Sequence, residues 1–106
     1  MERPQSLAAA EPHLRALDGQ IEETLAFLSG LIAPTRVEPG CVEYWLHHDN
    51  DDPADFTFYE NWTNRADWDK HMELPHLAKF AEVRDKVFAL QKLRLMTMIC
   101  DPVSLR

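Results

Sequence analysis

Two short runs rich in aromatic and β-branched residues constrain this chain most, because they predict a hairpin with large side chains on both faces. The runs are Cys41–His48 and Phe56–Trp62, and a dense cluster of turn-forming residues, Asp49–Asp55, separates them. Alternation along the second strand places four side chains on one face: Phe56, Phe58, Glu60 and Trp62. Tyr59 lies on the other face. An isolated antiparallel sheet usually keeps one face polar, so we expect both faces to be covered.

A helix is expected before the hairpin. Apolar residues recur at helical spacing through Gln20–Ala33, and Pro34 limits the predicted helix. The segment upstream, residues 7–17, is ambiguous because its alanines favour a helix whereas Pro12 interrupts one. Asp18-Gly19 then predicts a turn.

Two helices and a strand are expected after the hairpin. Asn64 can cap a short helix over Arg65–Met72, and Leu74-Pro75 ends that helix and starts the next. A helical stripe continues through His76, Phe80, Val83, Val87 and Leu90. The last apolar run, Leu93–Cys100, suits a strand. If residues 8–16 form a strand as well, the chain has an α+β fold, the ferredoxin-like split βαβ with a four-stranded antiparallel sheet.

Length and charge limit the classes of function. The 106 residues suffice for one domain, which we place over residues 7–106 after a flexible tail at residues 1–6. The net charge of -7 argues against binding to nucleic acid or to anionic lipid. No apolar run approaches the roughly 18 residues of a membrane span, and the first residues lack the order of a signal peptide. We therefore expect a cytoplasmic protein that binds no membrane.

Neither a disulfide nor a metal site is expected. Cys41 and Cys100 would lie on opposite edges of the sheet, beyond bridging distance. The acidic loop Asp49–Asp55 lacks the glycine and the terminal glutamate of a calcium loop, so we interpret it as a solvated hairpin loop. Histidines and carboxylates are plentiful but show no metal-ligand spacing, and the sequence predicts no metal or other cofactor.

Three motifs, taken together, resemble the antibiotic biosynthesis monooxygenase (ABM) family. They are Ala33-Pro34-Thr35-Arg36 with Glu38-Pro39-Gly40-Cys41 and Tyr44, then Phe58-Tyr59-Glu60 with Trp62, and finally His71 with Pro75-His76. The resemblance covers roughly residues 13–102. It implies a ferredoxin-like monomer that forms a homodimer through its sheets, as a dimeric α/β barrel, with a pocket between each sheet and its own helices.

The resemblance also implies an activity. Family members include cofactor-independent oxygenases of phenols and quinols, a sugar-phosphate isomerase, and haem-degrading relatives on the same fold. The haem-degrading relatives carry an asparagine where this chain has Pro12 and an axial histidine near Ala81. Both residues are missing here, which disfavours haem degradation.

The candidate catalytic residues are His71 and Glu60. We expect His71 to act as base or proton shuttle, with Glu60 orienting it, because a carboxylate among aromatics must be paired or have a raised pKa. The candidate substrate-binding residues are Trp62, Trp68, Phe58, Tyr44, His76 and His13. Each of them also has a structural interpretation: the aromatics as core, and His76 as a core histidine near a helix N-terminus.

The favoured hypothesis is a homodimeric monooxygenase that uses O₂ on a small planar phenol, quinol or polyketide-like ring. Without a flavin or a metal, the substrate itself must activate O₂, which requires a base, an aromatic clamp and a dry pocket. Two alternatives remain open. One is isomerisation of a small oxidised metabolite through an enediol, and the other is a non-catalytic ligand-binding or stress-response domain.

Overall fold

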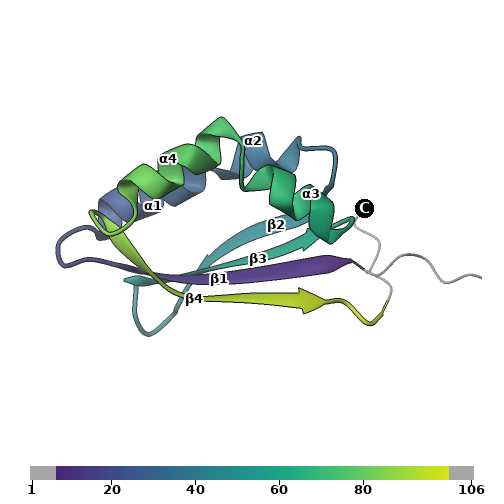
Figure 1. Ribbon diagram of the computed structural model, residues 1–106. Helices are drawn as coiled ribbons and strands as arrows, with labels where there is room; N and C mark the ends of the chain where they lie inside the picture. Colours follow the sequence, from purple (N-terminus) through teal and green to yellow (C-terminus); the bar gives the residue numbers. More distant parts are fainter. Residues whose placement is uncertain (1–6, 101–106) are drawn as a thin grey trace, which may run out of the picture.

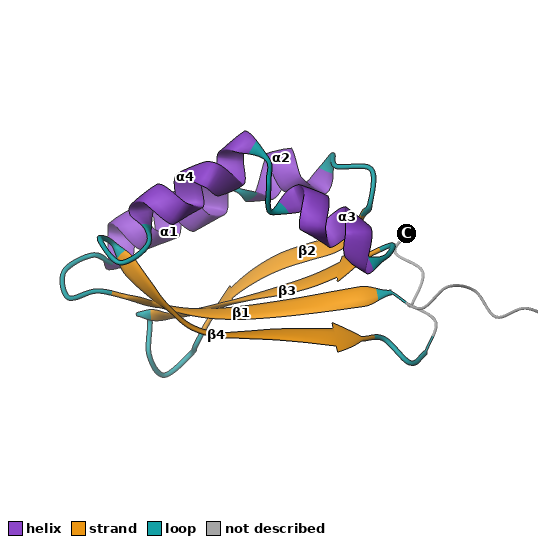
Figure 2. Ribbon diagram, viewed as in Figure 1, coloured by secondary structure: helices purple, strands orange, loops and turns teal. Residues whose placement is uncertain are grey.

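The computed structural model describes residues 7–100 and shows one antiparallel sheet covered on one face by helices (Figures 1 and 2). The elements, in chain order, are β1 (Ala8–Ala16), α1 (Ile21–Gly30), α2 (Ile32–Arg36), β2 (Cys41–His48), β3 (Asp55–Trp62), α3 (Arg65–His71), α4 (Pro75–Val83) and β4 (Phe88–Thr97). The tail predicted at residues 1–6 lies outside the described residues, as does the end of the predicted domain, residues 101–106.

The sheet has the strand order β2-β3-β1-β4, with all neighbouring strands antiparallel. This confirms the ferredoxin-like α+β fold and the placement of β2 and β4 at opposite edges. Residues 8–16 form a strand in spite of Pro12, which has no backbone N–H to donate. The pairing of β1 with β3 skips from Ala10 to His13 around this proline, whereas the pairing with β4 continues through it.

The inner face of the sheet carries the core. The four alternate side chains expected on one face of β3 are all buried: Phe56, Phe58, Glu60 and Trp62. They pack with residues from the other three strands and from the helical layer, namely Leu14, Leu28, Leu31, Tyr44 and Phe88. The polar exception in this row, Glu60, is therefore forced into an aromatic interior by the alternation of its strand.

Two predicted helix ends are wrong. The helix expected over Gln20–Ala33 is two helices, and Pro34 lies in the first turn of α2, where a proline is tolerated. The stripe expected to continue through Val87 and Leu90 is cut short, because α4 ends at Val83.

The chain reverses after α4 at Asp85, whose φ is 72°, and β4 begins at Phe88 rather than at Leu93. Phe88 is fully buried, and its ring stacks against Phe27 and packs at a tilt on Phe80. Burial of this ring accounts for the earlier start of the strand.

Gly40 brings the α2–β2 turn against α3. A Cβ atom at this position would overlap the side chain of Asp67. The near approach matters for the site described below, because the turn carries Glu38 and α3 carries His71. Asn64 caps α3 as predicted, since its Oδ1 accepts from the backbone N–H of Asp67 at 2.8 Å.

Replacement of Gly40 by alanine should therefore destabilise the fold. We expect Gly40→Ala to lower the free energy of unfolding by about 1–3 kcal/mol, the usual cost of overpacking a closed contact. Gly30→Ala is the matched control, because no atom lies within 4 Å of the added Cβ and the residue is helical. Urea unfolding of the three proteins measures this, and equal losses for both variants would contradict the close approach.

Candidate functional site

A cavity of about 260 Å³ lies between the inner face of the sheet and helices α3 and α4. Its lining is largely apolar and comes from residues Pro12, Leu31, Tyr44, Phe58, Glu60, Trp68, His71, Met72, Leu77, Ala78, Phe80, Ala81, Arg84, Leu90 and Leu93. Five predicted site residues therefore meet in one cavity: Tyr44, Phe58, Glu60, Trp68 and His71. The volume suits a ligand of one or two fused rings, below the usual size for a drug-like molecule.

Aromatic rings form the walls on the sheet side. The ring centroids of Tyr44 and Phe58 lie 4.8 Å apart, and those of Tyr44 and His71 lie 5.8 Å apart in an edge-to-face arrangement. Trp62 is fully buried behind His71, with the two centroids 4.5 Å apart. It supports the site without lining the cavity. Burial raises the pKa of Tyr44 far above its usual value, so this residue stays a neutral phenol.

Glu60 is a buried carboxyl group on the cavity wall. The residue is only 3% exposed, and its Oε1 accepts a hydrogen bond of 3.0 Å from Trp62 Nε1. Burial raises the pKa of Glu60 to about 7, against the lowering effect of the Trp62 hydrogen bond, and the nearby Glu38 raises it further. Near neutral pH this carboxyl can therefore both give and take a proton.

His71 comes from the last turn of α3 and is 1% exposed. Its Nδ1 lies 2.8 Å from Oε2 of Glu38. Burial lowers the pKa of His71, and the Glu38 carboxylate opposes that shift. The result is an imidazole that is neutral at pH 7 and has a carboxylate partner, which suits a proton acceptor.

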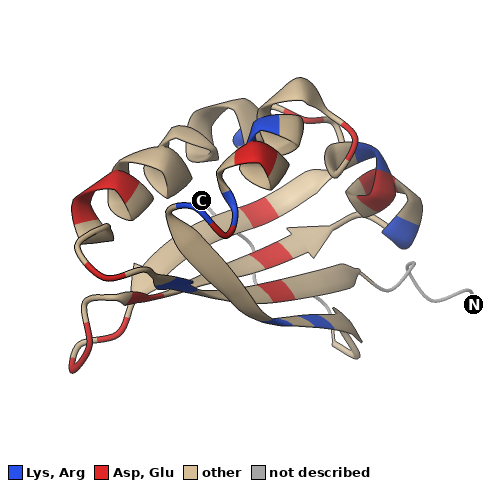
Figure 3. Cartoon of the chain, turned by 60° about the vertical axis from the view of Figure 1, so that its left-hand side comes forward, with Lys and Arg blue, Asp and Glu red and all other residues tan. Residues whose placement is uncertain are grey.

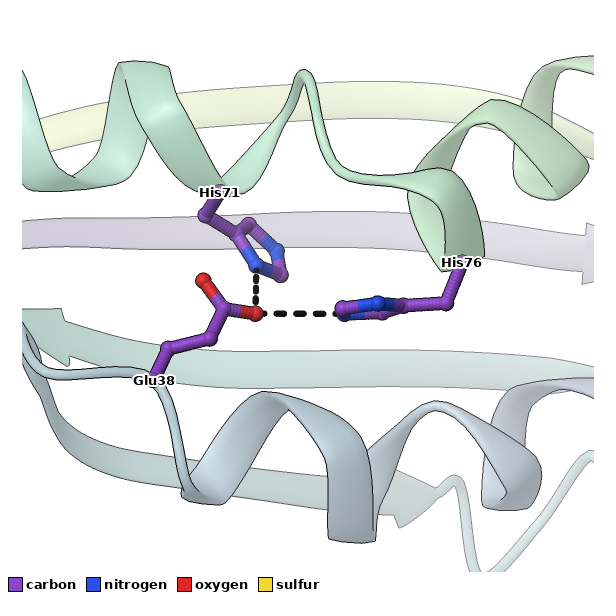
Figure 4. A group of neighbouring side chains, drawn as sticks. All are labelled: Glu38, His71 and His76. Carbon is purple, nitrogen blue, oxygen red and sulfur yellow. Dashed lines mark hydrogen bonds and ion pairs between the residues drawn. The ribbon is translucent and has the colours of Figure 1, made fainter.

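The partner of His71 differs from the one expected. Glu60 was predicted to orient this histidine, but Glu60 pairs with Trp62, and the carboxylate bonded to His71 is that of Glu38 (Figure 4). Glu38 was noticed only as part of the family motif. The motif was the available signal, since Glu38 stands 33 positions from His71 in the chain.

Two other predicted residues lie outside the cavity. His13 is on the opposite face of the sheet, where its ring contacts Glu11 and Thr57, because Pro12 and Leu14 take the inward positions of β1. The expectation that His13 lines the pocket is therefore wrong. His76, at the start of α4, lies beside the cavity lining and bonds to Glu38 at 3.1 Å.

Glu38, His71 and His76 are also the group of described residues whose ligand atoms lie close enough to hold a metal ion, all within 4.8 Å of one another. In the structure Oε2 of Glu38 lies within hydrogen-bond distance of both rings, 2.8 Å from Nδ1 of His71 and 3.1 Å from Nε2 of His76. A metal bound there would replace the N–H that each ring presents to Glu38, so the proton of a neutral ring would have to move to its other nitrogen.

The fold and the cavity define a ferredoxin-like domain with a small, aromatic, acid–base pocket beneath its helices. The model of the family described as antibiotic biosynthesis monooxygenase matches residues 9–83. The chain therefore belongs to the antibiotic biosynthesis monooxygenase family. None of the described helices is long and apolar enough to span a bilayer.

Solved structures agree with this membership. A crystal structure of an antibiotic biosynthesis monooxygenase is 26% identical, with a TM-score of 0.76 over 90% of this chain and 99% of that one. A crystal structure from Pseudomonas aeruginosa is 26% identical, with a TM-score of 0.80 over 92% of this chain and 96% of that one.

An uncharacterised protein of Synechocystis is 39% identical over 61 residues, which are 58% of this chain. The match spans 42% of that relative's own length. The likeness therefore concerns part of a longer protein.

The raised pKa of Glu60 predicts a pH-dependent stability. The folded state holds the proton of Glu60 up to about pH 7, whereas an unfolded glutamate loses it near 4.5. The stability contributed by this proton is present below pH 4.5 and is lost as the pH rises through 7. Glu60→Gln mimics the neutral carboxyl, so the variant should gain roughly 2–3 kcal/mol over the wild type between pH 5 and pH 8.5.

Urea unfolding of both proteins at the two pH values measures this gain. His71, whose pKa is lowered, makes stability rise with pH, but it does so in both proteins and cancels in the difference. A difference that does not change with pH would show that Glu60 is ionised in the folded protein at pH 5.

Proposed function

We propose that this protein is a cofactor-independent monooxygenase that oxidises a small planar phenol or quinol with O₂. The observation that supports the proposal is the pairing of a proton acceptor, His71, and a carboxyl with a pKa of about 7, Glu60, on the wall of one aromatic cavity. The family resemblance and the monooxygenase names of similar structures point the same way.

The proposed chemistry begins with removal of the hydroxyl proton by His71. The resulting phenolate is rich enough in electrons to reduce O₂, and the largely apolar lining keeps water away from the reactive pair. One oxygen atom enters the ring and the other leaves as water, with all four electrons supplied by the substrate. For 1,4-dihydroxynaphthalene, the balanced products are 2-hydroxy-1,4-naphthoquinone and water.

The cavity walls provide the remaining requirements. Tyr44, Phe58 and Trp68 offer flat surfaces on which an aromatic ring can stack. Glu60, protonated for part of the time near pH 7, can return a proton to the oxygen that leaves as water. Localisation in the cytoplasm remains an expectation from the sequence.

The same two groups suit isomerisation through an enediol, because a base and a neutral carboxyl can move a proton between adjacent carbons. Oxygen uptake separates the two functions. An isomerase consumes no O₂, whereas the monooxygenase consumes one molecule for each molecule of quinol.

Replacement of His71 should abolish most turnover. His71→Asn keeps a donor where Nδ1 stands and removes the second ring nitrogen, so we expect turnover of 1,4-dihydroxynaphthalene to fall by roughly 10²-fold or more. An oxygen electrode, corrected for autoxidation, measures the rate, and labelled O₂ identifies the hydroxylated product. The matched control is His48→Asn, at an exposed histidine near the acidic loop. Full activity of His71→Asn would remove His71 from the mechanism.

We also propose that the chain forms a homodimer through the outer face of its sheet. Trp45 on that face is 41% exposed, which is a large aromatic side chain for a monomer to leave in water. The sheet–sheet pairing implied by the family would cover it.

Light scattering should therefore give twice the chain mass at micromolar concentration, with an interface of well over ~1,200 Å². Trp45→Glu should shift the protein towards monomer. Leu25→Glu, at an equally exposed position on α1, should leave the dimer intact. A monomeric wild type would refute this arrangement.

A further inference from the structure

One oxygen atom of Glu38 meets two histidine rings. Oε2 lies 2.8 Å from Nδ1 of His71 and 3.1 Å from Nε2 of His76 (Figure 4). A carboxylate oxygen can only accept, so each ring must present an N–H to it. The proton of neutral His71 therefore resides on Nδ1, and its Nε2 keeps a lone pair.

That lone pair has no hydrogen-bond partner among the residues that the structure describes. His71 lines the cavity together with Glu60 and Tyr44. Neither Glu60 nor Tyr44 is hydrogen-bonded to the His71 ring, so Nε2 of His71 can accept a proton from a ligand.

The backbone holds Glu38 firmly in this position. Its N–H donates to Thr35 O at 3.0 Å, and its carbonyl accepts from Cys41 N at 3.1 Å. The α2–β2 turn, which includes Glu38, also packs closely against α3, because Gly40 lies directly beside the side chain of Asp67. The Glu38 side chain is only 10% exposed, so little water competes for its oxygen.

We infer that Glu38 is a positioning residue for the proposed reaction: it keeps the proton of His71 on Nδ1, aims Nε2 at the substrate, and stabilises the imidazolium that forms when Nε2 takes the substrate's proton. This inference rests on the proposed function. The step balances, because the hydroxyl proton passes to Nε2, the O–H electron pair stays on the substrate, and the new positive charge lies beside the carboxylate. In a poorly hydrated site this pairing is far stronger than in water.

His76 completes the arrangement as a second donor. The Nε2–H of His76 donates to Oε2 of Glu38, and the same nitrogen lies 3.3 Å from the hydroxyl oxygen of Thr35. With two donors on one oxygen, the carboxylate is prevented from rotating away from His71. The charged and titratable groups near His71 are thus Glu38, His76, Glu60 and the neutral Tyr44.

The first experiment needs no substrate. Nitrogen NMR of histidine side chains reports which ring nitrogen carries the proton. We expect the proton of His71 on Nδ1 in the wild type, and a pKa of His71 that falls by about one unit in Glu38→Gln, which removes the charge but retains a polar side chain. Glu73→Gln is the matched control, at an exposed glutamate two residues after His71. A wild-type proton on Nε2, or an unchanged pKa in Glu38→Gln, would overturn the inference.

The second experiment uses 1,4-dihydroxynaphthalene and O₂. Glu38→Gln should lower kcat by roughly 10–100-fold with little change in KM, because Glu38 does not touch the substrate. The acidic limb of the pH profile should move to lower pH, since a weaker base is protonated only at lower pH. A purely structural role would change stability without moving this limb.

Elemental analysis and zinc titration of the purified protein complete the design. A stoichiometric metal lost in Glu38→Gln would show that the three residues form a metal site, and this would contradict the positioning role. If the wild type consumes no O₂ with this quinol, the proposed function fails for it, while the NMR result still decides the proton position on His71.

Discussion

The alternation of side chains along β3 is the constraint on which the rest of this structure depends. Each second residue must point into the helices, so Phe56, Phe58, Glu60 and Trp62 enter the same interior. Three of these bury aromatic surface, which drives folding, and the fourth brings a carboxyl group with it. Burial of Glu60 disfavours its charged form, and this raises the pKa of the residue.

The helical layer adds a second polar group, His71, to the lining of the cavity that Glu60 also lines. In Figure 3 acidic residues lie on the helices and loops as well as on the sheet, but the acid that contacts His71 comes from the turn before β2. The close packing at Gly40 lets this turn reach α3. Burial alone would make His71 a weak base, and the Glu38 carboxylate counteracts that effect. Burial thus raises the pKa of Glu60 and lowers that of His71, and the Glu38 carboxylate limits the second shift.

Much of this arrangement could be predicted from local pattern. The two-residue period of β3 identified its inward face, and the Asn64 cap identified the start of α3. Other features depend on contacts distant in sequence. The strand through Pro12 is supported by pairing with β4, and the turn at Asp85 has no glycine or proline to mark it. His13 was assigned to the wrong face because the register of β1 was unknown.

The partner of His71 illustrates the same limit: the sequence pattern pointed to Glu60, whereas the α2–β2 turn brings Glu38, 33 positions away in the chain, to the ring. The central claim is that the cavity binds a phenolic ring with its hydroxyl at Glu60 and His71. A crystal structure of the complex with 1,4-dihydroxynaphthalene, prepared without O₂, tests it most directly. The account predicts the ring between Phe58 and Trp68, with a hydroxyl oxygen within roughly 2.6–3.2 Å of Nε2 of His71 and beside the Glu60 carboxyl. A ring bound elsewhere, or an empty cavity at saturating quinol, would contradict it.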